Sequence, residues 1–192
     1  MDIFLIRHAE SEANAGLRTS DPASISITDR GKSSAIRLSE TLEVQPELII
    51  VTRYVRTQQT AAPFINKYPS VPVEIWPLHE FTYLSPQACK NTTAKDRLSM
   101  VSEYWKLCDP NFIHGPGAES YSEFFHRVNQ SLTDLRNLNK KSALVFCHGL
   151  VIRLIKQLME YGEQPLYQSM AYFRDVMIKF PVPNAFILKI NC

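Results

Sequence analysis

An Arg-His pair, Arg7 and His8, directly follows the first apolar run of the chain. A neutral imidazole is a competent nucleophile near neutral pH, and a guanidinium group binds phosphate oxygens with bidentate geometry. Adjacent Arg and His residues are also common on protein surfaces. The pair alone therefore does not separate a catalytic site from an exposed surface pair.

Two later apolar runs are also followed by cationic or potentially cationic side chains. Arg56 comes shortly after the run 48–51, and His148 comes two residues after the end of the run 143–146. The carboxyl ends of parallel strands meet at one edge of a sheet, which is where open α/β sheets bind ligands. Burying several cations together is costly without an anion. The combination predicts a phosphate-binding site.

The apolar pattern predicts the elements that would position these groups. Short apolar runs, typical of strands covered on both faces, alternate with longer stretches of helical periodicity. This favours an α/β fold, a three-layer sandwich with a mostly parallel central sheet flanked by helices. The predicted strands are Ile3–Ile6, Leu48–Val51, Val73–Ile75 and Ala143–Phe146. The predicted helices are Asp29–Leu42 behind a Thr28 cap, Arg56–Lys67, Glu119–Leu138 and Leu150–Tyr161.

Two regions depart from this alternation. Val176–Phe180 and Ala185–Ile190 flank a segment with two prolines, which predicts two strands joined by a turn at an edge of the sheet, with an antiparallel arrangement as one option. Residues 82–117 have a weaker pattern with a short helix over 96–107, and we interpret them as a cap or lid. The expected organisation is one domain, 1–192, carrying this insertion.

Composition argues against several other classes of protein. The 192 residues include 21 basic and 19 acidic side chains with no long basic run, so neither a nucleic-acid nor a membrane partner is expected. Because the first residues lack a basic segment and the first apolar run is too short for a signal peptide, we expect a cytoplasmic protein. The four cysteines have neither disulfide-framework nor zinc-site spacing.

Several motifs occur in a specific order along nearly the whole chain. They are Arg7-His8-Ala9-Glu10-Ser11, the stretch 52–61, Gly117-Ala118-Glu119-Ser120 with Arg127-Val128, His148-Gly149 with Ile152-Arg153, and Pro183-Asn184-Ala185. In this order they resemble the signature motifs of the histidine phosphatase superfamily, also called the phosphoglycerate-mutase-like family.

The resemblance implies a site and a mechanism. His8 would carry the phosphoryl group as phosphohistidine, and Glu80, in the sequence Leu78-His79-Glu80, would protonate the leaving group. The side chains implied to hold the phosphate are Arg7, Asn14, Arg56 and protonated His148, together with Gly149. No metal and no organic cofactor are implied, because the arginines supply the positive charge. The segment Phe81–Pro86 differs from the Gly-x-Trp-Glu-Gly that commonly follows the acid, which leaves the substrate open.

Other polar residues are interpreted as lying outside the chemistry. Glu10 is expected to be structural, since a carboxylate facing the phosphate would repel it. Arg53, His79, His114 and His126 have no partner suggested by their spacing, so we interpret them as exposed or structural.

The resulting prediction is a metal-independent phosphate monoester hydrolase, a broad-specificity histidine acid phosphatase that releases inorganic phosphate. Its substrate would be a small phosphorylated metabolite, with a phosphoprotein as an alternative, and it would be a monomer or homodimer. One rival is a phosphoglycerate mutase, disfavoured because only residues 81–118 separate Glu80 from Glu119. The other is a non-catalytic phosphate-binding protein, disfavoured by the intact set of candidate residues.

Overall fold

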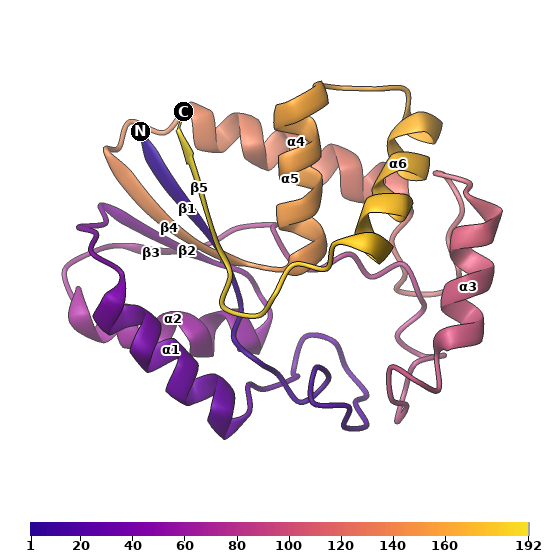
Figure 1. Cartoon of the computed structure of the whole chain (residues 1–192), viewed down its shortest axis with the longest axis horizontal. Coiled ribbons are helices and arrows are strands. Elements are labelled where there is room, and N and C mark those ends of the chain that lie inside the picture. Colours follow the sequence, from indigo (N-terminus) through magenta and orange to yellow (C-terminus); the bar gives the residue numbers. More distant parts are fainter. Residues whose placement is uncertain (192) are drawn as a thin grey trace.

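Five strands form one sheet in the computed structural model, which describes residues 1–191 (Figure 1). In chain order they are β1 (Asp2–Arg7), β2 (Leu48–Val51), β3 (Val73–Ile75), β4 (Ser142–Cys147) and β5 (Ile187–Asn191). The spatial order is β3-β2-β4-β1-β5. The first four strands are parallel, and β5 runs antiparallel to β1. The predicted α/β fold with a mostly parallel sheet is confirmed.

Helices cover both faces of the sheet. Figure 1 shows α1 (Asp29–Thr41) and α2 (Val55–Lys67) on one side, with α4 (Tyr121–Arg136) and α5 (Gly149–Tyr161) on the other. α6 (Leu166–Lys179) packs on α5, and α3 (Leu98–Leu107) lies in the long connection between β3 and α4. Each parallel strand is therefore joined to the next through at least one helix, which is the connection that parallel pairing requires.

The side chains of β1 point alternately into two separate hydrophobic cores. Ile3 and Leu5 pack in the larger core beneath α4 and α5, whereas Ile6 packs in the smaller core beneath α1 and α2. Successive strand side chains point to opposite faces, so one strand serves both cores. β2 and β4 are buried along their whole length. By contrast, β3 is exposed at the edge, where the side chain of Ile75 is 66% accessible.

The start of α1 supports the loop that follows β1. The Thr28 hydroxyl accepts a hydrogen bond from the Gly31 N–H at 3.1 Å, so the predicted cap is present. A Cβ at Gly31 would lie 2.2 Å from the Glu10 carbonyl oxygen. Only glycine permits this approach, which places the helix against the segment that carries His8.

The C-terminal prediction is correct for one strand and wrong for the other. Residues 176–179 complete α6, which ends before Pro181, and so the predicted strand over Val176–Phe180 is wrong. Met170 and Phe173, earlier in the same helix, are fully buried in the larger core. This packing outweighs the strand preference of the β-branched and aromatic residues that follow. The second strand is confirmed as β5, antiparallel and at the edge.

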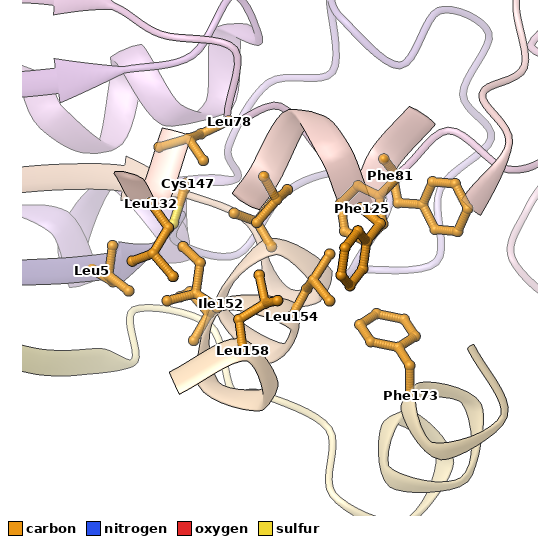
Figure 2. Packing of buried hydrophobic residues seen from close by; sticks show 14 of the residues in the cluster. Leu5, Leu78, Phe81, Phe125, Leu132, Cys147, Ile152, Leu154, Leu158 and Phe173 are labelled. Carbon is orange, nitrogen blue, oxygen red and sulfur yellow. The ribbon is translucent and has the colours of Figure 1, made fainter. Parts of the chain in front are cut away.

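The cap segment, defined here as residues 82–117, is joined to the larger core by aromatic rings. Phe81, directly before it, stacks on Phe124 of α4 with ring centroids 4.4 Å apart. Trp105 of α3 faces Phe173 of α6 at 6.0 Å. Figure 2 labels Phe81, Phe125 and Phe173, which belong to the same buried cluster as Leu78. The residues around the candidate acid Glu80 are therefore anchored in the core.

Phe81→Ala should lower the free energy of unfolding by about 3–5 kcal/mol, because it removes a buried ring that its neighbours cannot replace. Urea denaturation followed by far-UV circular dichroism measures the change. Ile75→Ala, on the exposed edge strand, is the control and should cost far less. Equal losses in the two variants would contradict the anchoring of this segment.

Candidate active site

His8 lies at the carboxyl end of β1 with one ring nitrogen held by the backbone. Its Nδ1 is 2.8 Å from the Ala9 carbonyl oxygen, which can only accept, so Nδ1 carries the hydrogen. The lone pair of Nε2 then accepts a hydrogen bond from Arg56 Nε at 3.2 Å. This tautomer leaves Nε2 as the nucleophilic atom.

The surroundings of His8 keep its ring neutral. The side chain is 3% exposed. Burial, followed by the positive charges of Arg56 and Arg7, holds the pKa of His8 well below its ordinary value, although the Ala9 carbonyl acts in the opposite direction. An unprotonated imidazole is the form that a nucleophile requires.

Arg56 comes from the first turn of α2 and is held from two sides. Its Nη1 donates to the Pro22 carbonyl oxygen at 2.6 Å, and its guanidinium lies 4.6 Å from the centre of the Tyr54 ring. A cation over an aromatic face is stabilised electrostatically. The contacts fix the guanidinium beside His8 before any ligand binds.

Arg7 reaches the same place from the end of β1. Its Nη1 donates to the Val182 carbonyl oxygen, whereas its Nε is buried and has no hydrogen-bond partner in the described chain. A Cβ at Gly149 would lie 3.3 Å from that Nε. Gly149 therefore gives the guanidinium room at the start of α5.

His148 is fully buried, with its ring centroid 5.2 Å from that of His8. Its Nε2 is 3.1 Å from the Thr52 hydroxyl, and its Nδ1 has no partner among the described residues. Burial, then the charge of Arg56, holds the pKa of His148 well below its ordinary value. A lowered pKa favours the neutral ring when no anion is bound, because burial and two nearby guanidinium groups disfavour a further cation.

Glu80 approaches the cluster from the segment after β3. Its Oε1 accepts hydrogen bonds from the N–H groups of Phe81 and Leu150, both at 3.2 Å. Burial raises the pKa of Glu80 above its ordinary value, although Arg56 and Arg7 act in the opposite direction. A raised pKa keeps a carboxyl group protonated to higher pH, as a general acid requires.

Asn14 is held at the rim by a hydrogen-bonded turn. Its Oδ1 accepts from the Ser11 hydroxyl at 2.9 Å and from Asn184 Nδ2 at 3.0 Å. Asn184 Nδ2 also lies 3.1 Å from the His8 carbonyl oxygen. The turn before β5 therefore braces the loop after β1.

These residues surround one end of a cleft of about 290 Å³. One wall of the cleft is formed by Arg7, His8, Asn14, Arg56 and Glu80. The opposite wall comes from the cap segment and includes Tyr83, Leu84, Pro86, Arg97 and Val101. His148 and Gly149 lie behind this surface and are not among the described residues that line it. The structure thus brings the predicted residues together, with one group lining the cleft and with His148 and Gly149 behind that group.

A family model described as histidine phosphatase superfamily (branch 1) matches residues 3–172. The chain belongs to this superfamily. Its fold is similar to the α-ribazole phosphatase from Shigella flexneri, with a TM-score of 0.74, 25% identity, and coverage of 100% of this chain and 90% of that chain.

Two more distant structures show the same fold. The Entamoeba histolytica phosphoserine phosphatase has a TM-score of 0.70 at 19% identity, covering 98% of this chain and 89% of that one. A mycobacterial glucosyl-3-phosphoglycerate phosphatase has a TM-score of 0.73 at 18% identity, covering 99% and 90%. No curated protein matches the chain. The superfamily and these solved structures together indicate a phosphatase.

Four residues of this histidine phosphatase contact the candidate site residues but were not predicted from the sequence to have a role. They are Thr52, Tyr54, Thr60 and Asn184, of which Thr60 accepts from the Ala9 N–H at 3.0 Å. All four fall inside or beside the motifs that carry the resemblance, which was the available signal. Their polar atoms meet partners far along the chain, and local spacing does not reveal such contacts.

The side chains interpreted as outside the chemistry are not among the described residues that line the cleft. Glu10 accepts from the Thr28 hydroxyl at 2.8 Å, in keeping with a structural role. Burial, with Arg127 and Arg53, lowers the pKa of His79 to about 3. His114 Nδ1 accepts from the Ser85 N–H at 3.4 Å.

Within residues 1–191 no group of three or more His, Cys, Asp or Glu side chains could hold a metal ion, and none of the described helices could cross a membrane. Cys89, Cys108 and Cys147 are free thiols. Cys192 lies outside the described residues.

Gly149→Ala should weaken phosphate binding by about tenfold, the worth of one impaired charge-assisted hydrogen bond, because the added methyl group would displace Arg7. Competitive inhibition by inorganic phosphate measures this effect. Alanine favours a helix start no less than glycine, so the unfolding midpoint should not fall. Unchanged inhibition would show that Arg7 does not need this space.

Proposed function

We propose that this protein hydrolyses phosphate monoesters through a phosphohistidine on Nε2 of His8. The observation that carries the proposal is the tautomer of His8: Nδ1–H donates to the Ala9 carbonyl oxygen, and the unprotonated Nε2 accepts a hydrogen bond from Arg56 Nε. The buried, unpartnered Arg7 Nε and His148 Nδ1 support it further, because a phosphoryl group supplies the acceptors they lack.

In the first step, Nε2 of His8 attacks phosphorus as the bond from phosphorus to the ester oxygen breaks. Glu80 gives its proton to that departing oxygen, so an alcohol leaves. Arg7 and Arg56 stabilise the equatorial oxygens, with Asn14 at the rim and His148 behind. His148 would become a better donor once the phosphoryl anion offsets the nearby guanidinium charges.

In the second step, a water molecule attacks the phosphohistidine. The ionised carboxylate of Glu80 takes a proton from this water, the bond from phosphorus to Nε2 breaks, and inorganic phosphate leaves. His8 and protonated Glu80 are then restored. The two guanidinium groups supply the charge stabilisation that a metal ion provides in other phosphatases, so we propose a metal-independent reaction.

The proposed substrate is a small phosphorylated metabolite, and the proposed enzyme is a single domain of broad specificity. Its cap segment forms one wall of the cleft. The relatives named for α-ribazole, phosphoserine and glucosyl-3-phosphoglycerate are consistent with this class. Besides Arg7 and Arg56, the described cleft wall contains one more arginine, Arg97. Its side chain is engaged within the protein, because it donates to the Thr93 carbonyl at 3.0 Å and to the Thr19 hydroxyl at 3.3 Å. Such a wall favours hydrolysis over a mutase reaction, which must retain a charged intermediate.

His8→Ala should abolish turnover of phosphate esters, because no other described side chain occupies the position of the nucleophile. Brief reaction of the wild-type protein with ³²P-labelled substrate, followed by alkaline quench and peptide mapping, should place acid-labile phosphate on His8. Excess EDTA should leave both results unchanged.

The matched control is His126→Ala, which removes an exposed histidine on α4 and should retain wild-type turnover. Label on serine or cysteine, or activity that returns only when magnesium is added, would overturn the mechanism.

Glu80→Gln should slow phosphorylation of His8 by alkyl phosphates by about a hundredfold, the usual worth of general acid catalysis. p-Nitrophenyl phosphate should be much less affected in this step, because its leaving group needs no proton. Wild-type rates with alkyl phosphates should fall as pH rises through the raised pKa of Glu80, and the rate of the variant should not show this fall. Rapid-quench kinetics across pH measures both effects.

With p-nitrophenyl phosphate the same variant should release about one equivalent of p-nitrophenolate per site in a burst, because the second step still lacks its base. Equal slowing of alkyl and aryl esters without a burst would show that Glu80 is not the proton donor.

A further inference from the structure

Glu80 lies on a segment with no secondary structure of its own. Between Ile75, the last residue of β3, and Leu98, the first of α3, all residues are described and none belongs to a helix or named strand. Proton transfer requires the carboxyl group to lie within hydrogen-bond reach of the reacting oxygen. Contacts from elsewhere in the chain must therefore set its position.

Arg127 of α4 supplies contacts on the N-terminal side of Glu80. Its Nη1 donates to the Pro77 carbonyl oxygen at 2.6 Å and to the His79 carbonyl oxygen at 3.1 Å. Leu78, between these two carbonyls, is fully buried in the larger core (Figure 2). One guanidinium thus binds the carbonyl directly before Glu80 and the carbonyl two residues earlier.

Glu119 holds the arginine and also the other side of the segment. Its carboxylate is bidentate to Arg127, with Nε–Oε1 and Nη2–Oε2 distances both 2.7 Å. Its backbone N–H donates to the Thr82 carbonyl oxygen at 2.9 Å. Residues on both sides of Glu80 are therefore tied to the same ion pair, which we call the 119–127 clamp.

The geometry of the clamp suits a positioning role. The two side chains are only 14% and 16% exposed, and bidentate pairing fixes the plane of the guanidinium as well as its distance. Neither side chain is among the described residues that line the cleft. The pair therefore reaches Glu80 through its contacts with this segment and does not itself line the cleft.

We propose that Glu119 and Arg127 are positioning residues that place the Glu80 carboxyl for proton transfer. This inference rests on the proposed function of Glu80 as general acid and base. Without the clamp, Glu80 keeps its buried neighbours Leu78 and Phe81 but loses the restraint on its flanking peptide groups. A displacement near 1 Å is enough to cost about a hundredfold in rate.

The test is a double-mutant cycle on Arg127→Met and Glu80→Gln, measured with an alkyl phosphate and with p-nitrophenyl phosphate. Arg127→Met should slow phosphorylation of His8 by the alkyl ester by about ten- to a hundredfold, within the total worth of the acid. The aryl ester should be slowed less than threefold in that step. In the Glu80→Gln background, Arg127→Met should add almost nothing with either ester.

Controls separate positioning from folding. Arg174→Met removes an arginine of α6 that also binds a neighbouring carboxylate, Asp175, but lies away from Glu80, and it should leave both rates unchanged. Retained hydrolysis of the aryl ester by Arg127→Met would itself report an intact site. If that variant fails to fold, the milder Glu119→Gln should show the same preferential loss with the alkyl ester.

Two results would overturn the inference: equal slowing of alkyl and aryl esters by a folded clamp variant, or an undiminished effect of Arg127→Met in the Glu80→Gln background. Both results count against the clamp only where Glu80→Gln itself shows the preferential loss with the alkyl ester, so the proposed function of Glu80 holds in that case. That function fails instead if the wild-type protein forms no phosphohistidine on His8.

Discussion

The site depends on positive charge that the protein buries without neutralising it. Arg7 and Arg56 lie beside two imidazoles whose pKa values are depressed and a carboxyl group whose pKa is raised, and burial also lowers the pKa of both arginines. Such an arrangement costs stability in the empty protein and favours an anion. The same charges disfavour protonation of the nucleophile. In the proposed function, affinity for phosphate and reactivity of His8 thus have one electrostatic origin.

The sheet makes this concentration of charge possible. β4 lies between β1 and β2, so three adjacent parallel strands end at Arg7, Cys147 and Val51. The residues that follow meet at one edge although they are far apart in the sequence. Hydrogen bonds across the edge, such as that between Thr52 and His148, then fix side chains from different strands against each other.

The acid is held differently from the nucleophile. His8 follows a buried strand directly, and its ring is oriented by the adjacent carbonyl of Ala9. Glu80 lies in an irregular segment secured by the burial of Leu78 and Phe81 and by hydrogen bonds to α4 and the start of α5. The Phe81–Pro86 segment differs from the sequence that commonly follows the acid in the family. Through Phe81 it attaches both the cap segment and Glu80 to the larger core.

The sequence by itself determined the parallel strands and the covering helices, because apolar periodicity records which faces are buried. It also indicated the candidate residues, because each follows a strand or falls within an ordered motif. Tertiary structure alone decided that residues 176–179 are helical, since the packing of Met170 and Phe173 outweighs local preference. It likewise decided the tautomer of His8, the lowered pKa of His148 and the contacts of Arg127 with Pro77 and His79. Each of these follows from burial and from partners distant in sequence, which local spacing does not encode.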